Sequence, residues 1–474
     1  MTPLDPATMT STSSASASAL GSSIAASAES APLVWEKSFD QLLNRLRQQL
    51  LGQEQFTLTL TAETSQFMRF NRAKIRQTGQ VLDGNLFLTW IAGTKTSDRA
   101  LPFTADVATD WPALQAAVKD LRQEIPQLPD DPYLVVPAGH GASRDVYPGQ
   151  LLSPNAVADT LLPEVRGLDF AGLYAGGWAI RAYGDSAGQQ HWFATETFTL
   201  DYSLFTGSGQ AVKGTFAGGE WNTNAYSRQI SGGKALLAKL ERSPKPVPRG
   251  QYRTYLAPAA VADLITMFSR GGVSEAAIRH GGSAFAALSR GERQLSPRFA
   301  LKENFIRGGV PRFNSLGEAA PDQLPIIREG RLVNSLVSSR TAKEYKIASN
   351  AAETYEGMRS PELSPGTLAQ EESLQALDTG LYVSNLHYLN WSDRPQGRVT
   401  GMTRYACFWV EGGEIVAPIQ NLRFDESLYH CFGDGLMALT NQVEFIPSVG
   451  TYGNRDLGGI WTPGALVENF TYTL

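Results

Sequence analysis

The residues best suited to chemistry lie in a short glycine-rich segment, GDSAG, at positions 184–188. It matches G-x-S-x-G, the turn that presents the nucleophile of a serine hydrolase between a strand and a helix. Here WAIRAY precedes Ser186 and HWFATETFTLDY follows it, so strand-like sequence flanks the serine on both sides. We therefore expect a hairpin turn of small residues, and a hydrolase that uses Ser186 is the alternative.

A second segment, HGGS at His280–Ser283, resembles an oxyanion-hole segment. In the hydrolase fold that segment precedes the nucleophile in the chain, whereas here it follows Ser186. We expect a glycine loop after a helix.

Histidines are the next candidates, because imidazole binds metals and transfers protons. The chain has five, at positions 140, 191, 280, 387 and 430. None precedes a glutamate and no two are spaced i, i+4, so the zinc helix patterns HExxH and HExxxH are absent. His387 and His430 could bind a metal together with a cysteine or carboxylate across strands, but a hydrogen-bonded structural role is the simpler interpretation. We expect no metal site made by this chain.

The only cysteines are Cys407 and Cys431. Cys407 lies in an apolar strand-like run, which predicts a buried, inert thiol. Cys431 follows His430 directly, and adjacent strand residues face opposite ways, so a Cys–His dyad is not expected. Two cysteines are too few for a disulfide framework, which favours a reducing, cytoplasmic location.

Charge and composition exclude several classes of protein. The 41 Lys+Arg and 46 Asp+Glu residues give a net charge of -5 without any block of like charge, so neither nucleic acid nor an anionic membrane is an expected partner. Neither a P-loop nor GxGxxG occurs. No apolar run approaches the roughly 20 residues that cross a bilayer, and the start of the chain does not resemble a signal peptide. We expect a soluble protein.

The elements that position these residues fall into two predicted domains. Residues 1–31 are Ser/Ala-rich and should form a disordered tail. From there to residue 245 the pattern alternates between amphipathic helices and strands with glycine turns, and the Pro-rich SPKPVPRGQ then predicts a linker. The domains are accordingly 32–245 and 246–474.

The second domain is predicted to be mostly β. A helix is expected over APAAVADLITMFSR (257–270), and strands dominate from about Arg298. Residues 349–373 are polar and predict an exposed loop. The stretch 398–424 predicts two strands joined by a Gly412-Gly413 turn, with Pro418 marking an edge or a bulge. The predicted fold class is α+β, with a mixed antiparallel sheet and helices first and a barrel-like or sandwich-like β domain second.

Several segments, taken in order, resemble one family. They are RFNRAKIRQTGQVLDGNLFLTWIAGTKTS, the strand block from GLDFAG to DYSLF, PIIREGRLV followed by SRTA, and Thr400-Gly401 followed by WVEGGEI and Pro418. Over about residues 35–474 this order is similar to the TldD/PmbA (TldD/TldE) family, called modulators of DNA gyrase and understood as proteases.

The resemblance carries an expectation about zinc. TldD-type subunits hold zinc with HExxxH on the first helix of the C-terminal domain and a cysteine near the chain end. Here the corresponding helix, 261–270, has no such ligands, and GTYGNRDLGG has Tyr452 or a neighbour where the cysteine is expected. The chain therefore resembles the PmbA/TldE subunit without the metal site. No catalytic, metal or substrate-binding residue is assigned to it, and zinc is expected in a TldD-type partner.

A chain without zinc ligands cannot activate water, but it can close a cleft and bind an extended peptide beside a partner's metal. We expect a dimer with a TldD-type zinc metalloprotease that processes unfolded or modified peptides. The alternative is a homodimeric peptide-binding or scaffold protein with no role in proteolysis.

Overall fold

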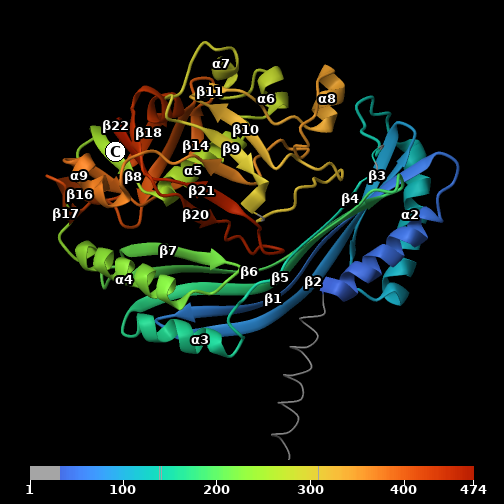
Figure 1. The fold of residues 1–474 in the computed structure, drawn as a ribbon, viewed down its shortest axis with the longest axis horizontal. Helices are drawn as coiled ribbons and strands as arrows, with labels where there is room; N and C mark the ends of the chain where they lie inside the picture. Colours follow the sequence, from blue (N-terminus) through green and yellow to red (C-terminus); the bar gives the residue numbers. More distant parts are fainter. Residues whose placement is uncertain (1–31, 138, 140, 308, 474) are drawn as a thin grey trace, which may run out of the picture.

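The computed structural model describes residues 32–473 except 138, 140 and 308. The predicted tail at 1–31 and His140 therefore lie outside the described residues. Figure 1 shows long strands that curve beneath a C-terminal part built from shorter strands. None of the helices in the described ranges is long and apolar enough to cross a membrane.

The N-terminal part is built on a sheet that has seven strands in the described ranges, with the order β3-β2-β1-β5-β6-β4 and with β7 also paired to β6. The strands are β1 (Glu54–Asn71), β2 (Lys74–Ala92), β3 (Lys95–Pro102), β4 (Ala142–Tyr147), β5 (Asp169–Asp185), β6 (Gln190–Phe205) and β7 (Ala211–Gly218). Every pair is antiparallel except β4 with β6. Arg72 and Ala73 join β1 to β2 in a two-residue turn, both with positive φ (51° and 53°), a backbone conformation that suits the twist of a hairpin.

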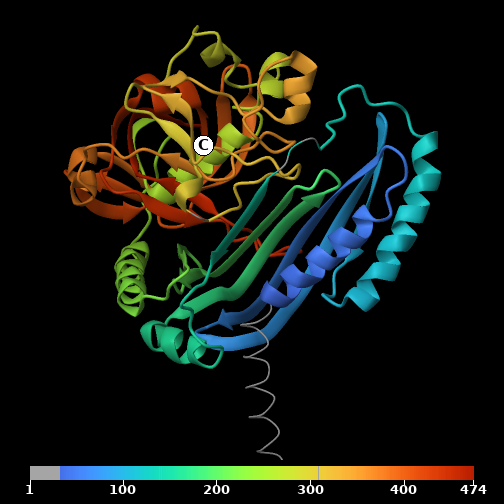
Figure 2. The ribbon, with the colours of Figure 1, turned by 45° about the vertical axis from the view of Figure 1, so that its right-hand side comes forward.

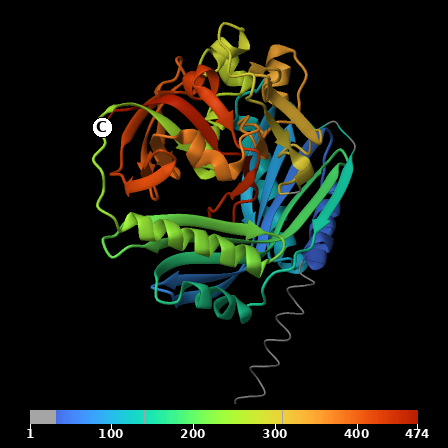
Figure 3. The same ribbon diagram turned by 60° about the vertical axis from the view of Figure 1, so that its left-hand side comes forward.

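Helices cover the outer face of this sheet (Figures 1 and 2). Residues 32–47 are helical, and this helix packs with α2 (Val107–Glu124) against even-numbered strand residues such as Leu58, Leu60 and Trp90. Because side chains alternate along a strand, the odd-numbered residues face the C-terminal part. At the other end of the strands lie α3 (Ala156–Leu161) and α4 (Thr223–Leu240), and α4 runs alongside β7 (Figure 3).

The C-terminal part contains two sheets and the helix α5 (Pro258–Ser269). Within the described chain, one sheet has six strands in the order β11-β10-β9-β12-β21-β20, and the other has nine, β14-β15-β18-β22-β8-β13-β16-β17 with β19 on β22. Residues of α5, including Leu264, Ile265 and Phe268, belong to one apolar core with residues of both sheets. The architecture is α+β with a mostly β second half, as predicted.

The strands of these sheets are β8 (Gly250–Leu256), β9 (Leu301–Asn304), β10 (Gln323–Arg328), β11 (Arg331–Leu332), β12 (Pro361–Leu363), β13 (Gly380–Val383), β14 (Asn385–Asp393), β15 (Arg398–Arg404), β16 (Phe408–Glu411), β17 (Glu414–Pro418), β18 (Arg423–Ser427), β19 (Leu436–Leu439), β20 (Glu444–Pro447), β21 (Gly459–Thr462) and β22 (Ala465–Tyr472). Short helices are α6 (Glu275–Arg279), α7 (Ala286–Ser289), α8 (Ser339–Tyr345), α9 (Ser373–Leu377), the 3-10 turns η1 (Ile125–Gln127), η2 (Leu162–Val165), η3 (Phe305–Arg307) and η4 (Gln370–Glu372), and the π-helical turn η5 (His430–Asp434).

Two predictions about the second half are wrong in detail. The polar stretch 349–373 is not an exposed loop, because β12 lies within it, is buried and pairs with β9 and β21. Two of its acids, Glu356 and Glu362, are buried, and Glu356 accepts hydrogen bonds from Ser274 and from the backbone of Ser338. Polarity misled the prediction because satisfied polar groups can be buried.

The stretch 398–424 is also more broken than predicted. Its first half is two strands, β15 and β16, separated at Tyr405, which has a φ of 64° that interrupts a strand. The Gly412-Gly413 turn does join two strands, β16 and β17. Pro418 ends β17, the edge strand of the nine-stranded sheet, which confirms the edge that proline predicted.

Candidate functional site

A cleft of about 350 Å³ opens between the two halves of the molecule. One wall comes from β6, β7 and the end of β4, and the other from β20, β21 and neighbouring loops. Its lining includes Tyr147, Glu196, Phe198 and Gly218 on the first wall and Arg307, Phe445, Asp456 and Trp461 on the second. In Figure 1, β7 and β20 lie beside each other at this place. Both are terminal strands of their sheets, so each offers an edge.

The second wall of the cleft is an aromatic and cationic cluster. The rings of Phe445 and Trp461 pack with centroids 4.8 Å apart, and the Arg307 guanidinium lies 4.0 Å from the Trp461 ring centroid. Arg307 also donates to Glu362 Oε2 at 3.0 Å. Burial raises the pKa of Glu362, but hydrogen bonds from Asn304 and Arg307 outweigh it, so that pKa lies below its ordinary value. The cluster presents flat apolar surface beside a fixed positive charge.

The loop that follows β20 fixes the floor of the cleft. Arg455 is 5% exposed and contacts the inner face of the N-terminal sheet. Its guanidinium donates to Ser65 Oγ (2.9 Å) and to the carbonyls of Gly177 (2.8 Å) and Thr197 (3.0 Å). Glu63 Oε2 lies 3.5 Å from Arg455 Nε and accepts its backbone N–H at 3.1 Å. The charge and hydrogen-bonding groups of Arg455 are thus matched, and the two halves are tied together.

Gly177 makes this approach possible. Its φ is 144°, and a Cβ there would lie 2.1 Å from the carbonyl oxygen of Thr64. Only glycine suits such a close backbone contact.

Helix α5 is the element on which the family resemblance would put zinc ligands. Asp263 is its one ionisable side chain, and its Oδ2 accepts the backbone N–H of Leu386 at 2.9 Å. Burial raises the pKa of Asp263 to about 7. A zinc site needs three protein ligands, and one carboxylate on a helix without His, Cys or Glu does not supply them. The residues of α5 do not fit a zinc ion.

Neither cysteine adds a ligand to α5. Cys407 and Cys431 are buried, and burial raises the pKa of Cys407 to about 11 and that of Cys431 well above its ordinary value. Tyr452, in the segment where the cysteine was expected, is fully exposed. In the described part of the chain, no group of three or more His, Cys, Asp or Glu residues is arranged to hold a metal.

Ser186 lies in the turn between β5 and β6, as the flanking strands predicted. Its Oγ accepts the backbone N–H of Phe56 at 3.1 Å, and its own N–H donates to Phe56 O. The hydroxyl therefore holds the turn onto β1. The turn between two strands is not the strand-to-helix elbow of a serine hydrolase.

His191 makes a second contact between the halves. Gln189 Nε2 donates to the carbonyl of Gly317 and also lies 3.0 Å from His191 Nε2. On the other side of the ring, Nδ1 lies 2.8 Å from Ser143 Oγ. The ring stacks on Phe313 (5.2 Å), and burial lowers the pKa of His191.

The remaining histidines are dispersed. His280 caps the end of α6, His387 lies on β14, and His430 contacts Glu426 through Nδ1 at 3.2 Å. Sequence reasoning missed the cleft residues Glu196, Arg307 and Trp461, because they come from distant parts of the chain. A tryptophan two residues after a Gly-Gly pair, at 458–461, was the one local signal available.

Comparisons with known proteins bear on the whole chain. Residues 249–474 match the family model described as the PmbA/TldA metallopeptidase C-terminal domain. No curated protein matches the chain.

Solved structures share the fold. TldE from Thermococcus kodakarensis superposes with a TM-score of 0.75 at 13% identity, covering 92% of this chain and 100% of that one. A candidate modulator of DNA gyrase from Thermotoga maritima superposes with a TM-score of 0.73 at 14% identity, covering 92% of this chain and 100% of that one. Another, from Bacteroides thetaiotaomicron, superposes with a TM-score of 0.73 at 15% identity, covering 92% of this chain and 98% of that one. Residues 249–474 thus belong to the PmbA/TldA metallopeptidase C-terminal domain family, and the likeness to the solved structures shows a shared fold over 92% of the chain.

Proposed function

We propose that this chain is the non-metal-binding, TldE/PmbA-like subunit of a TldD-type zinc metalloprotease that processes unfolded or modified peptides. The observation that carries this proposal is the composition of α5. The helix on which TldD-type subunits bear HExxxH here has Asp263 as its one ionisable residue. Hydrolysis by zinc needs a metal-bound water, so in the proposed assembly the partner supplies both the metal and the water.

The cleft between the halves gives the chain its own part in the proposed reaction. An extended peptide can pair its backbone with a terminal strand such as β7 or β20, while its side chains enter adjacent pockets. Phe445 and Trp461 offer aromatic surface for an apolar side chain. Arg307 pairs with Glu362 through Nε, and its remaining N–H groups can donate to a peptide carboxylate or carbonyl. Such a cleft holds an unfolded segment and keeps water away from it.

The test uses the full chain, first alone and then mixed with a TldD-type protein. Alone, it should contain well below one zinc per chain and show no peptidase activity towards an unfolded protein substrate. Mixing should produce chelator-sensitive cleavage. Stoichiometric zinc together with proteolysis by the lone chain would refute the proposal, and so would unchanged activity of the TldD-type protein after mixing.

A cleft variant tests the role in peptide binding. Trp461→Ala should weaken the mixed activity by raising KM, because it removes the aromatic wall, whereas Trp111→Ala on α2 should not. An equal effect of the two substitutions would argue against the cleft as the peptide site.

A further inference from the structure

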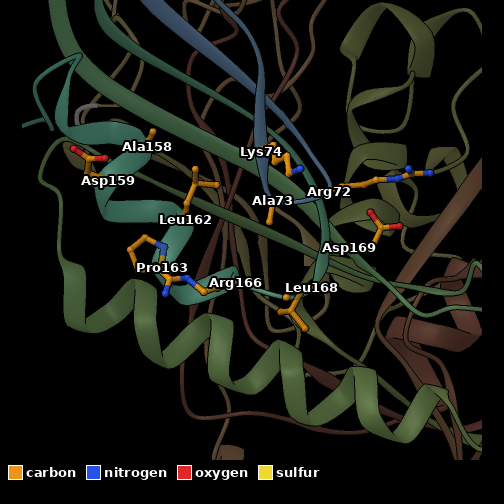
Figure 4. A pocket seen from close by; sticks show the side chains of 11 residues that line it. Arg72, Ala73, Lys74, Ala158, Asp159, Leu162, Pro163, Arg166, Leu168 and Asp169 are labelled. Atoms are coloured by element: carbon orange, nitrogen blue, oxygen red, sulfur yellow. The ribbon is translucent and has the colours of Figure 1, made fainter.

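The tip of the β1–β2 hairpin forms a hollow of about 650 Å³ with the connection from α3 to β5. Figure 4 shows Ala73 and Lys74 on one side and Leu162, Pro163 and Arg166 on the other. The side chains of Ala73, Leu162 and Pro163 make part of the lining apolar. None of the residues that line this hollow lines the cleft.

Positive charge gathers at the tip without being neutralised. Arg72, Lys74 and Arg166 line the hollow, and Arg69 and Arg76 flank it on the hairpin. In the part of the chain that the structure describes, none of these five side chains makes an ion pair or a side-chain hydrogen bond. The nearby carboxylates, Asp159 and Asp169, are likewise without such partners. Five free cations against two carboxylates leave a net positive site.

A second hollow adjoins the first at the tip. It has a volume of about 590 Å³ and is lined by Arg69, Arg72 and Arg76, with Leu173 and Phe205 as apolar lining. The two hollows share Arg72 and Asp169 in their linings. Cations beside apolar surface therefore extend around the end of the hairpin.

The adjoining edge of β2 is open. β3 pairs with residues 85–92 of β2, and in the described ranges no strand pairs with the outer edge of residues 74–83. That edge offers backbone donors and acceptors to an incoming strand, starting at Lys74 beside the first hollow. Exposed Ile75 and Leu82 lie along the same edge.

We propose that this basic hairpin tip and the open edge of β2 form a docking site for an extended acidic peptide segment. A peptide strand alternates its side chains between two faces, so carboxylates on both faces of a strand paired with β2 would lie near Lys74 and Arg76 on β2 and Arg69 on β1. The end of the peptide that runs past the tip would reach the first hollow, where Arg166 lies. A nucleic acid suits the site less, because it has no strand backbone to pair with β2. The inference does not depend on the proposed role beside a metalloprotease.

The test measures fluorescence anisotropy of a labelled peptide of about ten residues in which pairs of Glu alternate with pairs of Val, so that both faces of the strand carry carboxylates. A Lys-for-Glu peptide is the matched probe. The full chain should bind the acidic peptide and not the basic one, and the affinity should fall as salt screens the charges. The double variant Lys74→Glu/Arg166→Glu should weaken binding by about tenfold or more, since it replaces two attractions with repulsions. The control Lys37→Glu/Lys119→Glu changes the same charge at the opposite end of the sheet and should stay within about twofold.

Three results would overturn the proposal. These are no binding of the acidic peptide at millimolar concentration, equal losses in the tip and control variants, or binding of a DNA duplex at concentrations where the acidic peptide does not bind. Circular dichroism checks that each variant is folded. The neutral pair Lys74→Gln/Arg166→Gln repeats the test if the charge-reversed protein does not fold.

Discussion

Arg455, which contacts the middle of the N-terminal sheet, and the three arginines at the β1–β2 tip have opposite environments. In the middle of the sheet Arg455 is 5% exposed and is surrounded by Glu63, Ser65 and two backbone carbonyls. At the end of the same strands Arg69, Arg72 and Arg76 are exposed and have no ion pair in the described structure. Arg455 joins the two halves of the molecule, whereas the three hairpin arginines are available to bind a ligand.

The difference shows how to separate structural charge from binding charge. A buried charge is tolerated only when its partners replace water, so a fully matched arginine belongs to the fold. An exposed, unmatched one adds little to stability and keeps its electrostatic attraction for a ligand. Loss of stability and loss of binding should therefore occur in different variants.

Arg455→Met should give the largest effect. It removes the cation from buried Glu63 and leaves a charge and two carbonyls unpaired, which should lower the free energy of unfolding by about 3–5 kcal/mol. Arg72→Met at the tip should change it by less than about 0.5 kcal/mol. Urea unfolding measures the free energy of unfolding of both variants. Similar losses in the two would show that Arg455 contributes no more to stability than an exposed hairpin arginine.

Asp263→Asn sharpens the same comparison with a buried carboxyl that has no cation beside it. Burial raises the folded pKa of Asp263 to about 7 from 3.8, so its contribution to stability is complete below about pH 4 and is lost as pH rises through 7. At pH 8 the substitution should stabilise the protein by on the order of 2 kcal/mol, and at pH 4 by almost nothing, because Asn still accepts from Leu386. Thermal unfolding at both pH values measures this, with Asp120→Asn on α2 as the exposed control. A stabilisation that does not depend on pH would contradict it.

Ser186→Ala tests whether a hydroxyl near the junction of the halves is structural. The backbone N–H of Phe56 loses its acceptor, which should cost about 1 kcal/mol. Esterase activity on an activated ester should be the same as that of the parent chain. A loss of such activity without a loss of stability would instead support a catalytic serine.

His430→Gln should give the smallest effect. The hydrogen bond with Glu426 raises the folded pKa of His430, so its stabilisation is complete below about pH 6.5 and is lost as pH rises through the raised value. The side chain is 28% exposed, which limits the expected loss to about 0.5–1 kcal/mol at pH 5.5. Titration of the histidine by NMR measures the pKa directly, and a value at or below 6.5 would contradict the pairing.

Local pattern predicted much of the fold. Alternation of apolar and polar residues and turn residues predicted the long antiparallel strands. The strands on both sides of Ser186 predicted that it lies in a turn, and Pro418 predicted a sheet edge. The prediction failed where local polarity and tertiary burial disagree. The stretch around β12 is polar yet buried, because its acids find donors in distant segments. Tyr405 interrupts a strand because its φ is positive, and the neighbouring residues do not predict that conformation.

By itself the sequence determined the α+β class, the order of the elements, the resemblance to TldD/PmbA proteins and the lack of zinc ligands on the helix at 257–270. These depend on residue identity and on spacings of a few positions, which are local properties. Only the tertiary structure decided that Arg307, Trp461 and Glu196 share a cleft. It also decided that Arg455 has hydrogen-bond partners inside the sheet, whereas the cations at the hairpin tip have no ion pairs in the described structure. The physical reason is that burial and charge pairing depend on which distant segments meet, and that is set by the packing of the whole chain.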